Sequence, residues 1–259
     1  MPTLHIVIPF YNEANTLHTC IGRIQKAPLP QGWSAMIVLV DDHSDHHDRR
    51  AADAVVDHLR ADGQPCTLLR HERNRGKGAA LQTGFDAILA AGGAEDDLVL
   101  IQDADLEYDP ADYHRLLQPL LEGAAEVVVG SRFSGNRARG LNRAVHRGAN
   151  RVLSLLSNLM TGWRLADMEC CYKVMSVGTL RRLRPWLSEP RYGVEPQMIA
   201  ALSRLGARPA QVAVSYAPRS SGEGKKIRWT DGVRAIFVIV RERFRRRPAR
   251  ARPAGTGGA

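Results

Sequence analysis

Two aspartates that bracket one small residue are the part of this sequence best suited to chemistry. Asp103, Ala104 and Asp105 directly follow a continuous apolar run, which is typical of a strand buried on both faces. Two carboxylates at the end of such a strand suit Mg²⁺ or Mn²⁺, because these hard cations prefer oxygen ligands and can also bind a diphosphate. Glu107 is a third candidate metal ligand. A surface loop would show the same local pattern, so the surroundings decide.

Three other polar clusters also follow predicted strands. They are Pro9-Phe10-Tyr11-Asn12-Glu13, Asp41-Asp42-His43-Ser44 and Asn74-Arg75-Gly76-Lys77-Gly78. In an open parallel sheet, ligands bind outside the carboxyl ends of the strands, where these clusters would meet. Folding alone gives little reason for four polar clusters at one edge, so we expect a ligand site there.

Two of these clusters allow two interpretations each. Asp41 and Asp42 could bind a ribose hydroxyl or a base edge, or they could form a helix amino-terminal turn with Ser44 or Asp45 as the cap. The segment 74–78 combines two glycines, two cations and a following helix amino-terminus, which suits phosphate, although a tight turn would use the same residues. Neither the Walker spacing nor G-x-G-x-x-G is present, so a P-loop or dinucleotide site is not supported.

The elements that must position these residues alternate between strand and helix. We predict strands at 4–10, 35–40, 66–70, 98–102 and 127–130, and helices at 13–26, after 41–48, at 78–91 and from Asp109-Pro110 onward. The later part should hold a helix at 142–160, a loop at 167–173, a helix at 195–205, a strand at 211–216 and a helix at 229–246. This order predicts an α/β, Rossmann-like domain with a mainly parallel central sheet and helices on both faces.

The last predicted helix carries an apolar stripe, which comprises Trp229, Val233, Ile236, Phe237, Val240 and Phe244. This amphipathic helix, residues 229–247, would either pack on the main domain of residues 1–228 or lie at a membrane surface. Residues 248–259, rich in Pro, Ala, Gly and Arg, are expected to form a disordered basic tail.

The distribution of charge argues against a nucleic-acid partner. The formal net charge is +9, but residues 241–252 hold seven arginines and one glutamate, so that segment alone contributes +6. A terminal arginine cluster suits anionic lipid or solvent better than a nucleic acid, which favours a spread basic face. The apolar run at 235–240 is far too short to span a bilayer.

Cysteine usage and the amino-terminus indicate a cytoplasmic protein. The four cysteines include no C-x-x-C pair, so we expect reduced thiols and no structural zinc. Strand-like sequence begins at Leu4, and no secretory signal precedes it. We therefore expect the protein in the cytoplasm or at the cytoplasmic face of the membrane.

Taken together, the motifs resemble those of the inverting family 2 glycosyltransferases of the GT-A fold. The similarity rests on I-P-F-Y-N-E at 8–13, V-D-D-H-S at 40–44, N-R-G-K-G at 74–78 and D-A-D at 103–105. Later segments resemble the dolichyl/polyprenyl-phosphate mannose and glucose synthase branch: G-S-R-F at 130–133, D-M-E-C-C-Y-K at 167–173, Y-G-V-E-P at 192–196, and Tyr216, Arg219 and Gly224-Lys225-Lys226. The resemblance covers about residues 4–244, in order.

This resemblance implies a role for each matching residue. The nucleotide of a sugar donor would lie beside Pro9, Tyr11 and Glu13, with Asp41 or Asp42 at its base or ribose. Lys77 would face the diphosphate, and Asp103-Ala104-Asp105 would hold the donor and the metal, with Glu107 as a further metal ligand. The cations that would meet the acceptor phosphate or the donor diphosphate are Arg132, Arg219 and Lys225.

The expected reaction is metal-dependent transfer of a hexose from a UDP- or GDP-sugar to a polyprenyl phosphate, with inversion. The metal and Lys77 would offset charge on the leaving nucleoside diphosphate. An ionised phosphate acceptor needs no general base. A hydroxyl acceptor in a glycan, glycolipid or secondary metabolite would need one, and Asp167, Glu169 and Glu195 are the candidates, although each could instead be structural. Other readings are a non-catalytic nucleotide- or lipid-binding module and, with less support, a nucleotidyltransferase.

Overall fold

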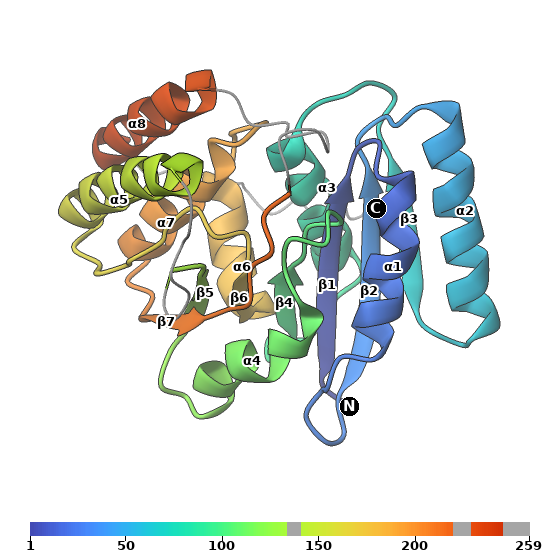
Figure 1. Ribbon diagram of the computed structural model, residues 1–259. Helices are drawn as coiled ribbons and strands as arrows, with labels where there is room; N and C mark the ends of the chain where they lie inside the picture. Colours follow the sequence, from blue (N-terminus) through green and yellow to red (C-terminus); the bar gives the residue numbers. More distant parts are fainter. Residues whose placement is uncertain (134–140, 220–228, 246–259) are drawn as a thin grey trace, which may run out of the picture.

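The structure is a computed structural model that describes residues 1–133, 141–219 and 229–245 (Figure 1). Within these residues, seven strands form one sheet in the order β3-β2-β1-β4-β6-β5-β7, and only β6 runs antiparallel to its neighbours. The strands are β1 Thr3–Phe10, β2 Ser34–Asp41, β3 Cys66–Arg70, β4 Leu98–Ile101, β5 Val127–Ser131, β6 Lys173–Ser176 and β7 Pro209–Ala213. The predicted mainly parallel α/β sheet is therefore confirmed.

Apart from one short helix at 177–183, the helices that surround the sheet begin and end close to the predicted positions. They are α1 Ala14–Gln25, α2 His46–Ala61, α3 Lys77–Ala90, α4 Tyr113–Leu121, α5 Leu141–Thr161, α6 Val177–Leu183, α7 Val194–Arg204 and α8 Trp229–Phe244, with short 3₁₀ turns at Pro110–Asp112 and Arg184–Trp186. Helix α1 packs with α2, whereas α3 packs with α6 and α7. Figure 1 shows α1 and α4 in front of the sheet and α3 behind it, so both faces are covered.

Continuous burial of the central strands explains their uninterrupted apolar sequence. Residues 4–10 of β1 and all four residues of β4 are buried, because helices cover both sides. The α3 helix lies so close to β1 that a Cβ atom on Gly84 would approach Val7 Cγ1 to 2.6 Å. Close packing here fixes where the carboxyl ends of these strands lie, and those ends carry the predicted clusters.

Helix α6 was not predicted, because its seven residues are too few to show a helical period. Two strands also differ from the sequence prediction. Strand β6 was not predicted: it is only four residues long and follows a segment predicted as loop, yet it bonds to β4 on one side and β5 on the other. Strand β7 begins at Pro209, two residues before the predicted start at 211, because its pairing with β5 sets its register from Val127↔Pro209 onward. Both differences arise from pairing partners that are distant in sequence.

Helix α8 packs on α5 and α7 through the face opposite to its apolar stripe. Its buried side chains include Ala235, Val238 and Ile239, whereas Val233 and Phe237 of the stripe are exposed. The stripe therefore does not pack on the domain, and the Trp229 side chain and the predicted tail at 248–259 lie outside the described residues. None of the described helices combines the length and the apolar character that a membrane span requires.

Candidate active site

The carboxyl ends of the parallel strands bring the predicted clusters to one edge of the sheet. The Asp42 amide donates to the Phe10 carbonyl at 2.9 Å, which joins the ends of β1 and β2. The Asn74 side-chain amide donates to the Asp42 carbonyl at 3.2 Å, and the Gln102 amide donates to the Val7 carbonyl at 3.0 Å. The acidic segment that starts at Asp103 therefore lies beside the other clusters, just beyond the end of β4.

A chain of alternating charges crosses this edge. The Lys77 ammonium lies 2.8 Å from Asp103 Oδ1 and 3.2 Å from Glu195 Oε1. The second oxygen of Glu195 lies 2.7 Å from the ammonium of Lys173, which is fully buried and also donates to the Cys170 carbonyl at 2.6 Å. Each buried charge has a partner, so the side chains of Lys77 and Asp103 are held in fixed positions.

The carboxylates after β4 repel one another. Burial, followed by repulsion from Asp103 and Glu107, raises the pKa of Asp105 to about 7. A divalent ion would remove this repulsion and favour the ionised carboxylate, because an opposite charge stabilises that form. Burial alone would lower the pKa of Lys77, but the nearby Asp103 carboxylate more than reverses this effect, so its pKa lies well above the usual value and the side chain stays cationic.

Glu107 and Glu13 hold the segment that carries Arg219. The Glu107 carboxylate accepts hydrogen bonds from the Arg219 amide at 3.0 Å and the Tyr216 hydroxyl at 2.9 Å. The Arg219 guanidinium lies 2.6 Å from Glu13 Oε2 and donates to the Asp105 carbonyl at 2.9 Å. Glu13 and Arg219 thus face each other in this structure, and a phosphate would have to replace Glu13 as the partner of Arg219.

Arg132 and Asp167 form a two-pronged ion pair. Arg132 Nε lies 2.7 Å from one carboxylate oxygen and Nη2 lies 2.8 Å from the other, and the Arg132 amide also donates to this carboxylate. Asp167 is fully buried, so its charge is satisfied by this arginine. Asp167 therefore orients Arg132, whose guanidinium carbon lies 5.4 Å from the ring centre of Tyr216, and is poorly placed to act as a base.

Glu169 differs from the other two candidate bases. Glu195 is held between two lysines and Asp167 is paired with Arg132, whereas Glu169 Oε1 is buried without a hydrogen-bond partner. Burial, followed by the charge of Glu195, raises the pKa of Glu169 to about 7. A carboxyl group with this pKa suits proton transfer near neutral pH.

Asp41 and Asp42 serve the local turns. Asp41 is fully buried and accepts a hydrogen bond from the Ser44 amide at 2.7 Å. Asp42 accepts from the Arg75 amide at 2.8 Å and the Gly76 amide at 2.6 Å, and so fixes the loop that leads into α3. The predicted cap on α2 is Asp45, which accepts from the Asp48 amide at 3.0 Å. These contacts support the turn interpretation, and a nucleotide contact by either aspartate stays a prediction.

The glycines of the 74–78 segment allow another loop to approach. A Cβ atom on Gly76, whose φ is +95°, would lie 2.5 Å from the Pro190 carbonyl, and one on Gly78 would collide with the Glu189 carbonyl. The Ala79 amide donates to the Pro190 carbonyl at 2.9 Å. Protein carbonyls therefore occupy part of the first turn of α3, and the side chains of Lys77 and the exposed Arg75 remain available to a phosphate.

The remaining predicted residues lie along the same edge or outside the described residues. Pro9 is buried in β1, Tyr11 is 38% exposed just beyond it, and Ala104 is buried between the two aspartates. Ala104 packs in the hydrophobic core, which explains why a small residue separates these aspartates. Lys225 lies outside the described residues, so its expected role stays a prediction.

Among the described residues, the side chains whose ligand atoms lie close enough together for one metal ion are Asp45, His47 and Asp48. They are not the predicted ligands, which are Asp103, Asp105 and Glu107. Asp45 caps α2, and Asp48 accepts a hydrogen bond from the Ala14 amide, so both have structural partners. The trio at 103–107 therefore remains the proposed metal site on its chemistry. All four cysteines are free thiols, as predicted.

Sequence reasoning missed two residues that position the site. Gln102 is fully buried, accepts hydrogen bonds from the Tyr113 and Tyr172 hydroxyls at 2.8 Å each, and donates to the Asp103 carbonyl at 2.9 Å. Lys173 was given no role, although it stands in a motif that carried the family resemblance. The available signal was one lysine within the otherwise uncharged segment 170–177, because a charge among apolar residues needs a partner.

Comparison with known proteins identifies the family of this chain. Residues 5–184 match the domain described as Glycosyl transferase family 2, which is more than half of the chain, so the protein belongs to this family and is a glycosyltransferase. An undecaprenyl-phosphate mannosyltransferase of Micrococcus luteus is 30% identical over 230 residues, 85% of each chain. An undecaprenyl-phosphate 4-deoxy-4-formamido-L-arabinose transferase of Pseudomonas aeruginosa is also 30% identical; the match covers 85% of this chain but 59% of that transferase.

A solved structure confirms the GT-A fold. Glucosyl-3-phosphoglycerate synthase from Mycobacterium tuberculosis, in complex with Mn²⁺, uridine diphosphate and phosphoglyceric acid, has a TM-score of 0.66 to this chain. Sequence identity is 20%, and the match covers 94% of this chain and 79% of that one. At this identity the likeness establishes the fold, and the donor and acceptor must be argued separately.

Proposed function

We propose that this glycosyltransferase moves a hexose from a UDP- or GDP-sugar to a polyprenyl phosphate, with inversion at the anomeric carbon. The observation that carries the proposal is the position of Lys77. Its ammonium lies 2.8 Å from Asp103, and the charge of Asp103 also raises the pKa of Asp105. A fixed cation beside a carboxylate pair suits a metal-bound diphosphate. The 30% identity with the undecaprenyl-phosphate mannosyltransferase of Micrococcus luteus supports the acceptor class.

The donor half of the site would act by electrostatic stabilisation. Asp103, Asp105 and Glu107 would hold Mg²⁺ or Mn²⁺, which when bound neutralises diphosphate charge. Lys77 would donate to a diphosphate oxygen and offset the negative charge that grows as the sugar leaves. Because Glu195 and Lys173 hold Lys77 in place, little reorganisation would be needed during the reaction.

The acceptor half would bind an anion. Arg132, oriented by Asp167, presents a guanidinium whose remaining N–H groups suit phosphate oxygens. A phosphate monoester is ionised at neutral pH and can attack without a base. We further propose that the protein works in the cytoplasm as a peripheral membrane protein, since such an acceptor is anchored by its lipid.

A direct assay tests the proposal. The protein is incubated with Mn²⁺, a short polyprenyl phosphate and, in turn, UDP-glucose, UDP-GlcNAc and GDP-mannose. We expect a glycolipid that mild acid hydrolyses, made from one donor, and lost in Asp105→Ala. The matched control is Asp57→Ala, because the Asp57 side chain is 78% exposed on α2. The same assay is repeated with Mg²⁺ in place of Mn²⁺. Absence of product with every donor and with each of these two metal ions would contradict the proposal.

One observation favours a second candidate, transfer to a hydroxyl acceptor. Glu169 has the unpaired carboxylate oxygen and the raised pKa that a general base for a hydroxyl would use. Acid stability separates the two, because a glycosyl phosphate hydrolyses far more easily than most glycosides. A product that survives mild acid and disappears in Glu169→Gln would favour this second function.

A further inference from the structure

Two exposed apolar stripes lie on helices that pack against each other. The exposed side chains on α8 follow the spacing of one helix face and are Val233, Ile236, Phe237, Val240 and Phe244. On α5, Val152, Leu155 and Leu159 are 63%, 69% and 77% exposed, at the same spacing. Figure 1 shows α5 and α8 side by side at the end of the molecule away from α2.

Helix α5 exposes part of its apolar surface, although Leu153, Leu156 and Met160 of the same helix pack against the core. Its buried side chains include Asn150, Ser154 and Ser157, whereas its leucines at 155 and 159 face outward. Ser154 is committed to the fold, since its hydroxyl accepts from the Met168 amide at 3.1 Å. Contiguous apolar side chains on a surface mark interaction sites, because leaving them in water forfeits their burial.

The parts of this chain outside the described residues lack the side chains to cover these stripes. Residues 134–140 and 246–259 contain no Val, Leu, Ile, Met or aromatic residue, and 220–228 contain one such residue, Ile227. An apolar cover must therefore come from outside these 259 residues.

Charge indicates what that cover is. Helices α5 and α8 together contain six arginines, at 143, 147, 151, 234, 241 and 243, and two acidic residues, Asp231 and Glu242, a net charge of +4. Glu242 is buried and bound to arginines, so it adds little negative charge to the surface. A second copy would set these arginines against their equivalents across a two-fold axis, whereas anionic headgroups would neutralise them.

We propose that the exposed faces of α5 and α8 form the surface by which this protein docks on an anionic lipid bilayer. The apolar stripes would enter the boundary between headgroups and acyl chains, and the exposed side chains of Arg151 and Arg243 would bind the headgroups, whereas Arg234 and Arg241 are paired with Glu189. The biological reason for docking rests on the proposed lipid-phosphate acceptor, but the surface itself is argued from burial and charge.

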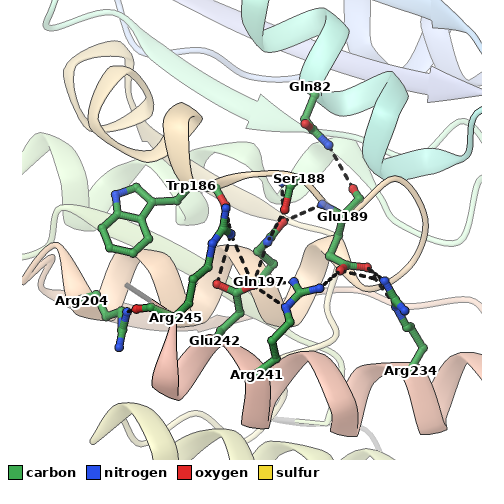
Figure 2. A network of polar contacts seen from close by, with 10 residues as sticks. All are labelled: Gln82, Trp186, Ser188, Glu189, Gln197, Arg204, Arg234, Arg241, Glu242 and Arg245. Atoms are coloured by element: carbon green, nitrogen blue, oxygen red, sulfur yellow. Dashed lines mark hydrogen bonds and ion pairs between the residues drawn. The ribbon is translucent and has the colours of Figure 1, made fainter. Parts of the chain in front are cut away.

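Ion pairs between α8 arginines and the buried Glu189 join this surface to the active-site edge (Figure 2). Arg234 and Arg241 of α8 lie 3.0 and 2.6 Å from Glu189, which is 2% exposed. The Glu189 carbonyl accepts from Gln82 of α3 at 3.0 Å, and the adjacent Pro190 carbonyl caps the first turn of α3, where Lys77 lies. A bilayer bound to α8 would therefore be held in a fixed position relative to Lys77.

Vesicle flotation tests the docking surface. The vesicles are phosphatidylcholine alone, or phosphatidylcholine with about 30% phosphatidylglycerol, and contain no polyprenyl phosphate. We expect the protein to bind the anionic vesicles, and Leu155→Glu/Phe237→Glu to reduce the partition coefficient at least tenfold. Leu121→Glu is the matched control, because Leu121 is an exposed leucine on α4, and it should bind as the wild type does.

Thermal unfolding and UDP binding, which should match the wild type, verify that the double variant is folded. The proposal is overturned if the wild type ignores anionic vesicles, or if the folded double variant binds them equally well. It is also overturned if light scattering shows a wild-type dimer that the double variant loses, since the surface then joins two copies. Because the vesicles hold no acceptor, binding is scored separately from transfer, and failure of one leaves the other measurable.

Discussion

Lys77 is the residue on which the donor half of the site depends most. Its ammonium is the cation beside Asp103, and the first turn of α3 is otherwise partly occupied by the 189–190 carbonyls. We expect Lys77→Met to lower kcat by about 10²–10³-fold, the usual cost of losing one preorganised charge on a leaving group. Steady-state kinetics with the donor identified above would measure this loss.

A matched lysine controls for the removal of charge. Lys26 is exposed at the end of α1, so Lys26→Met should keep kcat within about twofold. Equal activity of the Lys77 and Lys26 variants would contradict the role given to Lys77.

Glu169 should make stability depend on pH. Burial raises its pKa to about 7, so between about pH 4.5 and 7 the folded protein keeps a proton that the unfolded chain releases. The free energy of unfolding should therefore fall as pH rises through this window, by about 2–3 kcal/mol, since each pKa unit corresponds to about 1.4 kcal/mol. Glu169→Gln cannot titrate, so its advantage over the wild type should be near zero at pH 4.5 and largest above pH 7.

Urea denaturation at several pH values measures this difference. Curves for the wild type and Glu169→Gln that stay parallel from pH 4.5 to 8 would show that Glu169 ionises as it does in water.

At the residue scale, the local sequence predicted which side chains carry the chemistry, but it did not predict which side chains they pair with. The order of D-A-D after an apolar strand predicted Asp103 and Asp105, because strand burial and carboxylate chemistry are both local. The pairing of Glu13 with Arg219 joins residues 206 positions apart, and that of Lys173 with Glu195 depends on β6, so neither followed from spacing.

The start of α3 is the element whose glycines the structure explains. A side chain on Gly78 would collide with the Glu189 carbonyl, which is backbone and cannot rotate away. We expect Gly78→Ala to reduce the free energy of unfolding by about 1–3 kcal/mol, despite the higher helix propensity of alanine. Gly22, inside α1 with no atom within 4 Å of the added carbon, is the control, and Gly22→Ala should be neutral or stabilising by up to about 1 kcal/mol. Denaturant unfolding of the two variants, with equal effects, would disprove the close approach.

Helix α8 depends on Glu189 for its position. Glu189→Gln would leave Arg234 and Arg241 without their charged partner, so we expect the α8 amides to exchange hydrogen at least tenfold faster. Asp86 also pairs with an arginine, Arg184, but its side chain is 55% exposed, and Asp86→Asn should leave α8 exchange unchanged. Hydrogen-exchange mass spectrometry measures both, and an unchanged α8 in Glu189→Gln would contradict the link.

At the element scale, periodicity located the long helices and the buried strands, because both patterns repeat within a few residues. It could not locate β6, since four residues show no period and the strand exists only through β4 and β5. Periodicity also identified the stripe on α8 but not which way it faces; packing of α8 on α5 and α7 turns that stripe outward.

On the scale of the whole molecule, the charged site and the exposed apolar stripes lie in different parts of the fold. The carboxyl edge of β1, β2 and β4 gathers the acidic and cationic side chains, and the layer of α5, α7 and α8 carries the exposed apolar stripes. The 188–191 segment connects the two, since it contacts α3 on one side and α8 on the other (Figure 2). Such an arrangement suits an enzyme whose donor is soluble and whose acceptor is held in a lipid layer.

The most direct test of this account is the structure of the product. An α-linked nucleotide sugar is supplied with a short polyprenyl phosphate, and the purified lipid product is analysed by ¹H and ³¹P NMR. The account predicts a β-glycosyl phosphodiester, the result of one inverting attack by the acceptor phosphate. An α-linked product, or a sugar attached through a hydroxyl with the phosphate unchanged, would contradict it.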